Sequence, residues 1–361
     1  MSEPSFDPWM TPAGPPPPGI TPNFTNPPTQ APLLRNGIYV ILPLVLLFLL
    51  ARIYTRAFIS RVFGIDDYIC IVSATAIFAQ GGVLLGLLNL KPFTPLGRHL
   101  WDIPVAAFSD EYLKLIILAL VTFPVAALLV KLTLLALYYR LFKPSAWARR
   151  LIWSGFILLL IFYVSTTIIL LVACVPSSGE TWISRVRTGA CPTVQVEITR
   201  SQGVFGLAVD LYIFIIPIWQ VSILSLPPQR KAGILLIFMT GLIAVASSAG
   251  GLVTRERVTL VDPNLLISPY LFCLLEVGIG LICSCMPIIM VPLKSLTASS
   301  WSSVKKLSKT LISKPGKTEP KRPIEALPQI PNGTLAWRGL PQTTTGDARV
   351  TAIKGAFEAA L

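Results

Sequence analysis

Three ionisable residues stand alone near the middle of long apolar stretches: Lys131, Asp210 and Glu276. A charge in the hydrocarbon of a bilayer is costly unless it is paired or wetted, so such residues mark polar sites with a structural or functional role. At about 1.5 Å per helical residue, all three fall close to the membrane midplane. We therefore expect Lys131 to face a bundle interior and to pair with Asp210 or Glu276, leaving the other carboxylate protonated or bound to water.

Two interpretations of this buried charge network remain open. It is either a polar clamp between helices or a switch coupled to a ligand or a proton, and either one requires the three side chains to lie close together. A third interpretation is an intramembrane enzyme that uses Glu276 or Asp210 as acid or base. The sequence contains no HExxH, GxSxG, Walker or redox CxxC motif, so no catalytic residue is assigned.

Seven apolar stretches are each long enough to cross a bilayer. Hydrophobic residues make up 53% of the 361 residues and charged residues 13%, about half the charged fraction of a typical soluble domain, roughly 25%. The net charge of +13 comes from basic residues that lie mostly between and after the apolar stretches, which fits a membrane surface and not a nucleic acid. The predicted fold is an all-α membrane protein, a seven-transmembrane helix bundle over residues 37–293, in the plasma membrane or an endomembrane. Its spans are 37–56, 67–90, 113–140, 151–173, 203–225, 232–253 and 265–293.

The distribution of Lys and Arg predicts the orientation. With the N-terminus outside and the C-terminus in the cytoplasm, the inner connections and the tail up to Arg322 hold seventeen Lys and Arg, against nine outside. This topology places Cys174 and Cys191 in one outer loop, on the oxidising side, and we expect a disulfide between them.

The ends of the chain have a different composition from the spans. Residues 1–36 are Pro-rich and are predicted to form a disordered extracellular tail, in which Asn23 begins a glycosylation sequon. Residues 294–314 place Trp301 and following apolar residues at helical spacing beside lysines, which predicts a basic amphipathic helix on anionic inner-leaflet lipids. Residues 315–361 are predicted to be a disordered cytoplasmic tail.

Two loop motifs carry further candidate residues. Asp66 and Asp67 enter the second span from the inner side, where acidic residues favour a helix N-terminus; capping is preferred over cation binding because neighbouring carboxylates diverge on a helix. The outer-loop motif is Gly97, Arg98, His99, Trp101 and Asp102. Its Arg98 and Asp102 are candidates for an ion pair that shapes an outer vestibule, and Trp101 for an interfacial anchor. One histidine cannot supply a zinc site alone, so no metal is expected.

An ordered set of short motifs resembles the fungal rhodopsin-domain integral membrane family, of the satratoxin-cluster type. The set runs over roughly residues 38–293: Gly64 to Tyr68, Gly97 to Pro104, Lys131 to Thr133, Tyr139 to Phe142, Cys174 to Pro176, Trp182, Cys191, Asp210, Pro217, Pro227 to Lys231, Leu275 to Val277 and Cys283 to Pro287. The resemblance implies seven helices, an outer N-terminus and a fungal source, and little about biochemistry.

The chain departs from the family pattern in the sixth span. Where the family usually carries an Arg near the outer end, this chain has Gly250 and Gly251, and Arg255, one helical turn on, is the candidate substitute. The seventh span has no lysine before Lys294 at its inner edge, so nothing supports a retinal Schiff base, and no cofactor is expected.

The favoured function is a receptor-like sensor, without retinal, of a small, partly apolar molecule that arrives from the outer side, coupled to a cytoplasmic signalling partner. The alternative is a membrane component, either transporter or accessory protein, of a fungal secondary-metabolite biosynthetic pathway. Transporters often contain internal repeats, and the two halves of this sequence show none, which weighs against transport.

Overall fold

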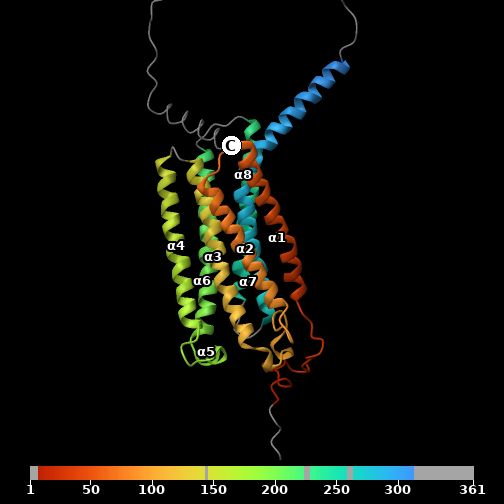
Figure 1. Cartoon of the computed structure of the whole chain (residues 1–361), viewed down its shortest axis with the longest axis vertical. Helices are drawn as coiled ribbons and strands as arrows, with labels where there is room; N and C mark the ends of the chain where they lie inside the picture. The colour runs from red at the N-terminus through yellow and green to blue at the C-terminus, as the bar shows by residue number, and fades with distance from the viewer. Residues whose placement is uncertain (1–6, 143–144, 223–227, 258–262, 313–361) are drawn as a thin grey trace, which may run out of the picture.

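The computed structural model describes residues 7–142, 145–222, 228–257 and 263–312 (Figure 1). Over these residues the protein is a bundle of seven long helices with one short helix, α5, at one end. The long helices are α1 (Ala31–Tyr54), α2 (Ile65–Leu88), α3 (Asp110–Leu141), α4 (Ala146–Cys174), α6 (Cys191–Ser222), α7 (Pro228–Glu256) and α8 (Ile267–Ile312), and α5 is Trp182–Thr188. A π-helical turn, Thr55–Ser60, continues α1, and 3-10 turns span Leu100–Asp102, Val105–Ala107 and Pro263–Leu266.

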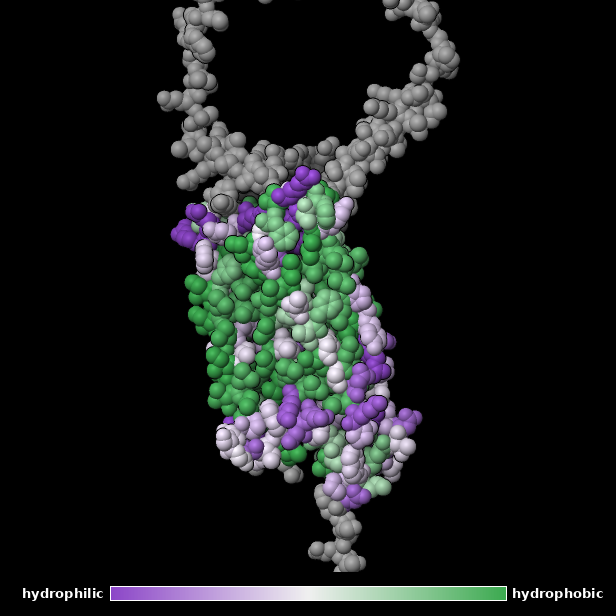
Figure 2. Space-filling model, viewed as in Figure 1, coloured by the Kyte–Doolittle hydropathy of each residue, from purple (hydrophilic) through white to green (hydrophobic). Residues whose placement is uncertain are grey.

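Six of the long helices, counted over the described residues, are long and apolar enough to cross a membrane: α1 with its π-helical turn, α2, α3, α4, α6 and α8. Their surface supports this. On the face shown in Figure 2, an apolar band lies between two hydrophilic ends, and on α4 large side chains such as Ile161 and Val172 are 64% and 71% exposed. A surface of this kind needs lipid around it, so the chain is a multi-pass integral membrane protein.

The two ends of the bundle differ in what they carry. One end holds residues 7–30, α5 and the disulfide between Cys174 and Cys191, and we call it the disulfide end. The other holds Arg52, Arg56 and Arg140, and we call it the arginine end. Successive long helices along the chain run in opposite senses between these ends, as short connections require.

The helices α3 and α8 lie at the centre of the bundle. The helix α8 packs against α1, α2, α3 and α7, and α3 packs against α2, α4, α6 and α8. The close contact of α1 with α8 depends on a glycine, since a Cβ at Gly278 would lie 2.7 Å from Ile41 Cγ2. This arrangement brings Lys131 of α3 and Glu276 of α8 to the bundle interior.

Several helices are longer than the apolar stretches predicted from hydropathy. The fifth span was expected at 203–225, whereas α6 begins at Cys191, because its first three turns contain polar residues such as Gln195, Thr199 and Arg200. Helices also begin at polar caps: the Ser109 and Ser145 hydroxyls accept from the N–H groups of Tyr112 and Ala148, each at 3.3 Å. Capping residues therefore set the starts, and hydropathy detects only the apolar part.

The N-terminal segment differs from the predicted disordered tail over 1–36. Residues 7–30 lie against the loop between α2 and α3, and α1 already begins at Ala31. Backbone hydrogen bonds hold the segment there: Ala13 N to Ile103 O at 2.9 Å, Val105 N to Thr11 O at 3.0 Å, and Gln30 N to Gly97 O at 2.9 Å. Proline excludes a helix but leaves the N–H groups of its neighbours free to pair in extended structure, which composition alone does not reveal.

The predictions for the C-terminal part of the chain, a helix over 294–314 and a tail over 315–361, can be compared with the structure only up to residue 312. The backbone is helical through 294–312, but as a direct continuation of α8, which projects beyond the bundle at the arginine end (Figure 1). The proposed lipid-facing side chains of this segment, and the tail at 315–361, lie outside the described residues.

Candidate functional site

Lys131 joins the two carboxylates that the sequence singles out. Its side chain is buried on α3, and its ammonium forms an ion pair with Asp210 of α6. The same Nζ lies 3.4 Å from Glu276 Oε1 of α8 and donates to the Gly206 carbonyl at 3.4 Å. Lys131 therefore interacts with both Asp210 and Glu276. The sequence predicts an ion pair with only one of the two.

Arg255 supplies a fourth charge, which the sequence indicates only as a substitute for a family arginine. Its side chain is 2% exposed on α7. The Nη2 atom lies 3.3 Å from Glu276 Oε2 and 3.1 Å from Cys273 Sγ, and the guanidinium sits over the Phe123 ring, 4.8 Å from its centroid.

These four residues form what we call the central charge cluster: Lys131, Asp210, Arg255 and Glu276. The Ser248 hydroxyl also donates to Asp210. Two cations face two carboxylates, so the cluster is neutral when all four groups are ionised. Because the members come from α3, α6, α7 and α8, a change at one of them alters the packing of four helices.

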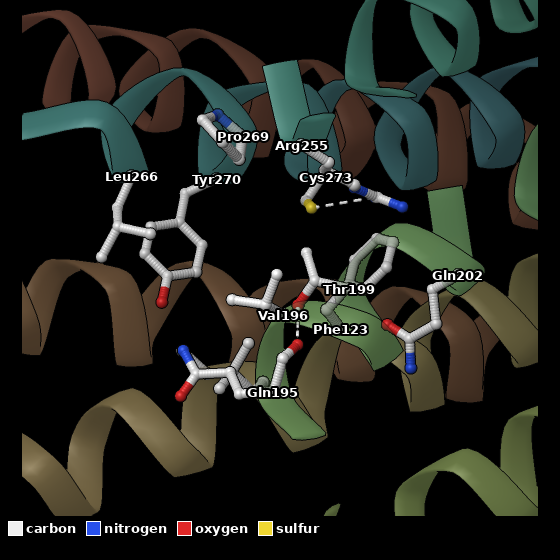
Figure 3. A pocket seen from close by; sticks show the side chains of 12 residues that line it. Phe123, Gln195, Val196, Thr199, Gln202, Arg255, Leu266, Pro269, Tyr270 and Cys273 are labelled. Atoms are coloured by element: carbon white, nitrogen blue, oxygen red, sulfur yellow. Dashed lines mark hydrogen bonds between the residues drawn. The ribbon is translucent and has the colours of Figure 1, made fainter. Parts of the chain in front are cut away.

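A cavity on the disulfide side of this cluster has a volume of about 40 Å³, and we call it the Arg255 cavity. Figure 3 shows side chains from α3, α6, α7 and α8 around it, with Arg255 beside Cys273. Its walls combine apolar groups with a few polar ones: Ala119, Leu120, Phe123, Gln195, Val196, Thr199, Gln202, Arg255, Leu266, Pro269, Tyr270 and Cys273. Few polar groups in an apolar wall are typical of a small-molecule site.

A second cavity of about 30 Å³ lies on the other side of the cluster, toward the arginine end, and Asp210 lines it together with Tyr138 and Cys283. We call it the Asp210 cavity. The central charge cluster is thus bordered by one cavity toward each end of the bundle.

A second group of charges closes the arginine end, and we call it the Arg52 cluster: Arg52, Arg56, Asp66, Asp67 and Arg140. Arg52, 1% exposed, donates to Asp66 Oδ2 at 2.8 Å, to Asp67 Oδ1 at 2.9 Å and to the Ser284 carbonyl at 2.8 Å. Arg140 donates to Asp66 Oδ1 at 2.9 Å, and Arg56 lies 3.5 Å from both carboxylates.

The Arg52 cluster extends the role predicted for the two aspartates. Asp67 does cap α2, since its Oδ2 accepts from the Gly64 N–H at 2.9 Å. Both carboxylates also tie α2 to α1 and α3. The sequence signal for these ties is a pair of arginines four residues apart at the end of the first span, Arg52 and Arg56, whose charges by themselves indicate only topology.

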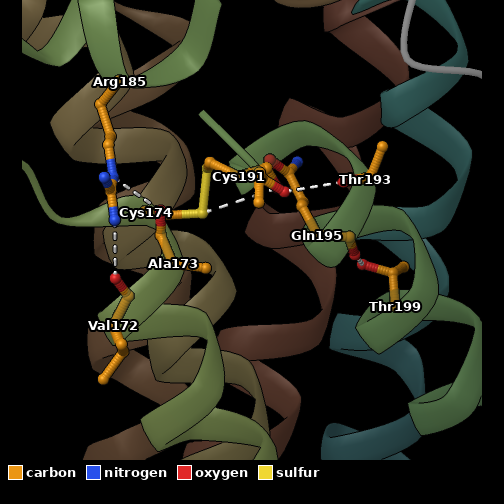
Figure 4. The surroundings of a disulfide bond; sticks show 9 residues. Val172, Ala173, Cys174, Arg185, Cys191, Thr193, Gln195 and Thr199 are labelled. Atoms are coloured by element: carbon orange, nitrogen blue, oxygen red, sulfur yellow. Dashed lines mark hydrogen bonds between the residues drawn. A yellow bond between two sulfur atoms is a disulfide. The ribbon is translucent and has the colours of Figure 1, made fainter. Parts of the chain in front are cut away.

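The disulfide between Cys174 and Cys191 joins the end of α4 to the start of α6 (Figure 4). Arg185 of α5 completes the junction: its Nε donates to the Ala173 carbonyl at 2.9 Å and its Nη2 to the Val172 carbonyl at 3.1 Å. A cation at the last carbonyls of a helix satisfies acceptors that have no intrahelical partner.

The outer-loop motif holds the N-terminal segment in place. Gly97 has φ +88°, and a Cβ there would lie 2.9 Å from the Ala31 nitrogen, so only glycine fits. His99 stacks on Trp101 with centroids 4.4 Å apart, and Asp102 accepts from the backbone N–H of Asn23 at 2.9 Å.

Arg98 of the same motif lies over the Phe93 ring, 4.2 Å from its centroid. Burial lowers the pKa of its guanidinium, and the Asp102 carboxylate acts in the opposite direction. The motif is thus a packed junction between the loop and the N-terminal segment, and its residues lie outside the lining of the Arg255 cavity.

Comparison with known proteins identifies the family of the chain. The fungal rhodopsin domain matches residues 51–295, which include both charge clusters, the disulfide and the outer-loop motif. No curated protein and no solved structure matches the sequence. The match covers well over half of the chain, and the protein therefore belongs to the fungal rhodopsin domain family.

Proposed function

We propose that this protein is a seven-span, receptor-like sensor that binds a small, partly apolar molecule in the Arg255 cavity, without retinal. In this proposal α7 is the seventh span, the disulfide end faces outward and the arginine end faces the cytoplasm. The excess of basic residues on the inner side and the disulfide at the opposite end support this orientation. The two cavities that border the central charge cluster, about 40 and 30 Å³, are far too small for a retinal chromophore.

The observation that carries the proposal is that one residue, Arg255, belongs to both the cavity wall and the central charge cluster. A ligand acceptor that approaches Arg255 competes with Glu276 for its guanidinium. Glu276 then interacts more strongly with Lys131, whose other partner is Asp210 on α6. A ligand can shift the bundle between two arrangements only if it binds them unequally, and this shared arginine provides that difference.

The cytoplasmic readout would lie at the arginine end. The helix α3 runs from the cavity, past Lys131, to Arg140 in the Arg52 cluster, so a shift of α3 at the central cluster reaches the Arg140 contact. A signalling partner and anionic inner-leaflet lipids are the proposed contacts of this face and of the helix beyond residue 293.

A carrier is the second candidate, and the Asp210 cavity is the observation that favours it. Transport by alternating access requires approach to one site from both sides of the membrane, and cavities border the central charge cluster on both sides. The carrier proposal includes the role of a transporter in a fungal secondary-metabolite pathway.

Hydrogen exchange separates the two candidates. The purified full-length protein in lipid nanodiscs is incubated with millimolar butanoate, butanamide, butanol or indole, and exchange is followed by mass spectrometry. A sensor should show protection around 119–123 and 266–273 with one of these probes and, at the same time, altered exchange at 138–142 on the arginine end. Protection confined to the cavity, together with uptake of the same probe into proteoliposomes, would favour the carrier.

A further inference from the structure

Two buried polar atoms that line the Arg255 cavity lack a hydrogen-bond partner among the described residues: Arg255 Nε and Tyr270 Oη. Arg255 is 2% exposed and Tyr270 is 6% exposed, so bulk water does not satisfy them. Buried polar groups are almost always hydrogen-bonded, and an exception requires an explanation. Here the two exceptions, one from α7 and one from α8, border the same cavity (Figure 3).

The chemistry of the wall indicates what would satisfy both atoms. A guanidinium N–H only donates, and a phenol donates readily, so the missing partner is an acceptor. Planar carboxylates match the guanidinium geometry best, because two oxygens can accept from one arginine. Leu120, Phe123 and Leu266 supply apolar contacts for the remainder of such a molecule.

We propose that the Arg255 cavity binds a small aliphatic monocarboxylate, which accepts hydrogen bonds from Arg255 and Tyr270, and that one proton is taken up for each molecule bound. The inference rests on the proposed function in that it names the ligand class of the same cavity. It says nothing about whether the bound molecule moves the arginine end.

The proton follows from the charges at the site. The central charge cluster is neutral with all four members ionised, so an added carboxylate would leave one negative charge uncompensated in the bundle interior. Burying an unpaired charge is far more costly than protonating it. The proton resides on the ligand, on Asp210 or on Glu276, and the binding stoichiometry is the same in each case. The titratable groups at the cavity wall are Arg255 on α7 and Tyr270 and Cys273 on α8. Behind them lie the other members of the central charge cluster, Lys131 on α3, Asp210 on α6 and Glu276 on α8, with Tyr163 of α4 beside Lys131 and outside the cavity lining.

The small cavity volume, about 40 Å³, restricts the ligand to a short chain. Butanoate is therefore the probe, and butanamide is its neutral control of nearly the same shape. Isothermal titration of the full-length protein in nanodiscs, at about pH 6, 7 and 8, gives the Kd of each. Repeating one pH in buffers of different ionisation enthalpy gives the number of protons taken up.

The proposal predicts that butanoate binds more tightly than butanamide, that its Kd rises about tenfold per pH unit, and that one proton is taken up. Tyr270→Phe removes the phenol without breaking any hydrogen bond among the described residues, so it should fold and should weaken butanoate binding about tenfold. The matched control is Tyr163→Phe, because the Tyr163 hydroxyl is also buried without a partner among the described residues but lies outside the cavity lining. It should leave the Kd unchanged.

Tighter binding of butanamide, a Kd for butanoate that does not change with pH, or equal effects of the two tyrosine variants would each overturn the inference. So would the absence of butanoate binding to the folded protein. These failures are distinct from failure of the sensor proposal. If butanoate binds as predicted but hydrogen exchange at 138–142 does not change, the carboxylate site is supported and the sensor proposal is wrong. If butanamide binds more tightly and alters hydrogen exchange at 138–142, the sensor proposal is supported and the carboxylate site is wrong.

Discussion

Lys131 is the residue on which the central charge cluster depends, because its ammonium faces Asp210 and Glu276 at once. Lys131→Met keeps most of the side-chain volume but leaves Asp210, whose side chain is 12% exposed, without its cation. We expect the variant to lose about 3–5 kcal/mol of stability, as when one partner of a buried pair is removed. Thermal unfolding of the purified protein in detergent measures the loss.

The control is the double variant Lys131→Met with Asp210→Asn. It removes one charge of each sign and leaves Glu276 paired with Arg255, so most of the lost stability should return. A single variant as stable as the native chain would contradict the buried ion pair. Recovery of folding is expected whether the pair is a clamp or a switch, and recovery of ligand response only if it is a clamp.

The Arg52 cluster allows a matched comparison of two arginines that bind the same aspartates. Arg52 is 1% exposed and also donates to the Ser284 carbonyl, whereas the Arg140 side chain is 28% exposed. Arg52→Gln should therefore cost about 3–5 kcal/mol, and Arg140→Gln only about 0–1 kcal/mol, since solvent screens the exposed pair. Chemical denaturation of both variants gives the difference, and equal losses would contradict it.

At the scale of single residues, the sequence identifies a buried charge when it stands alone in an apolar stretch. Lys131, Asp210 and Glu276 satisfy this condition. Arg52 and Arg255 lie near the ends of their stretches, where a charge is expected to face water or headgroups. Their burial depends on which helices pack beside them, and no local pattern encodes that.

At the scale of elements, the disulfide fixes the end of α4 against the start of α6, with α5 in the closed loop. Its cysteines are 17 residues apart. The double change Cys174→Ser with Cys191→Ser should lower stability by about 3 kcal/mol, because the unfolded chain loses a constraint on a loop of this length. Thermal unfolding with and without a reducing agent measures this effect.

The native chain in reducing agent should resemble the double variant, and the double variant itself should not respond to the reducing agent. A response that persists in the double variant would show that reduction acts elsewhere.

Hydropathy locates the apolar cores of the helices well and their ends poorly. The clearest case is α6, whose first three turns are polar on the side that reaches the Arg255 cavity. Because polar residues of the cavity wall lie in these turns, hydropathy excludes the turns from the predicted span. The N-terminal segment was missed for a different reason: its contacts to the loop at 97–107 are backbone hydrogen bonds, which depend little on side-chain type.

At the scale of the whole molecule, the proposed orientation places Asn23 outside and Asn332 in the cytoplasm. Asn23 is exposed and begins one sequon, and Asn332 begins the other. Glycans are added only on the lumenal side, so expression in a fungal host should yield a glycan at Asn23 alone. Asn23→Gln should abolish the gel shift on endoglycosidase treatment, and Asn332→Gln should not change it. A shift lost only in Asn332→Gln would reverse the orientation.

The central claim is that the central charge cluster carries the effect of a molecule in the Arg255 cavity to the arginine end. The most direct test compares the native chain with the Lys131→Met, Asp210→Asn double variant, in nanodiscs, by hydrogen exchange with the probe that protects the cavity. We predict protection at 266–273 in both proteins and a probe-dependent change at 138–142 in the native chain alone. The same change at 138–142 in the double variant would contradict the claim.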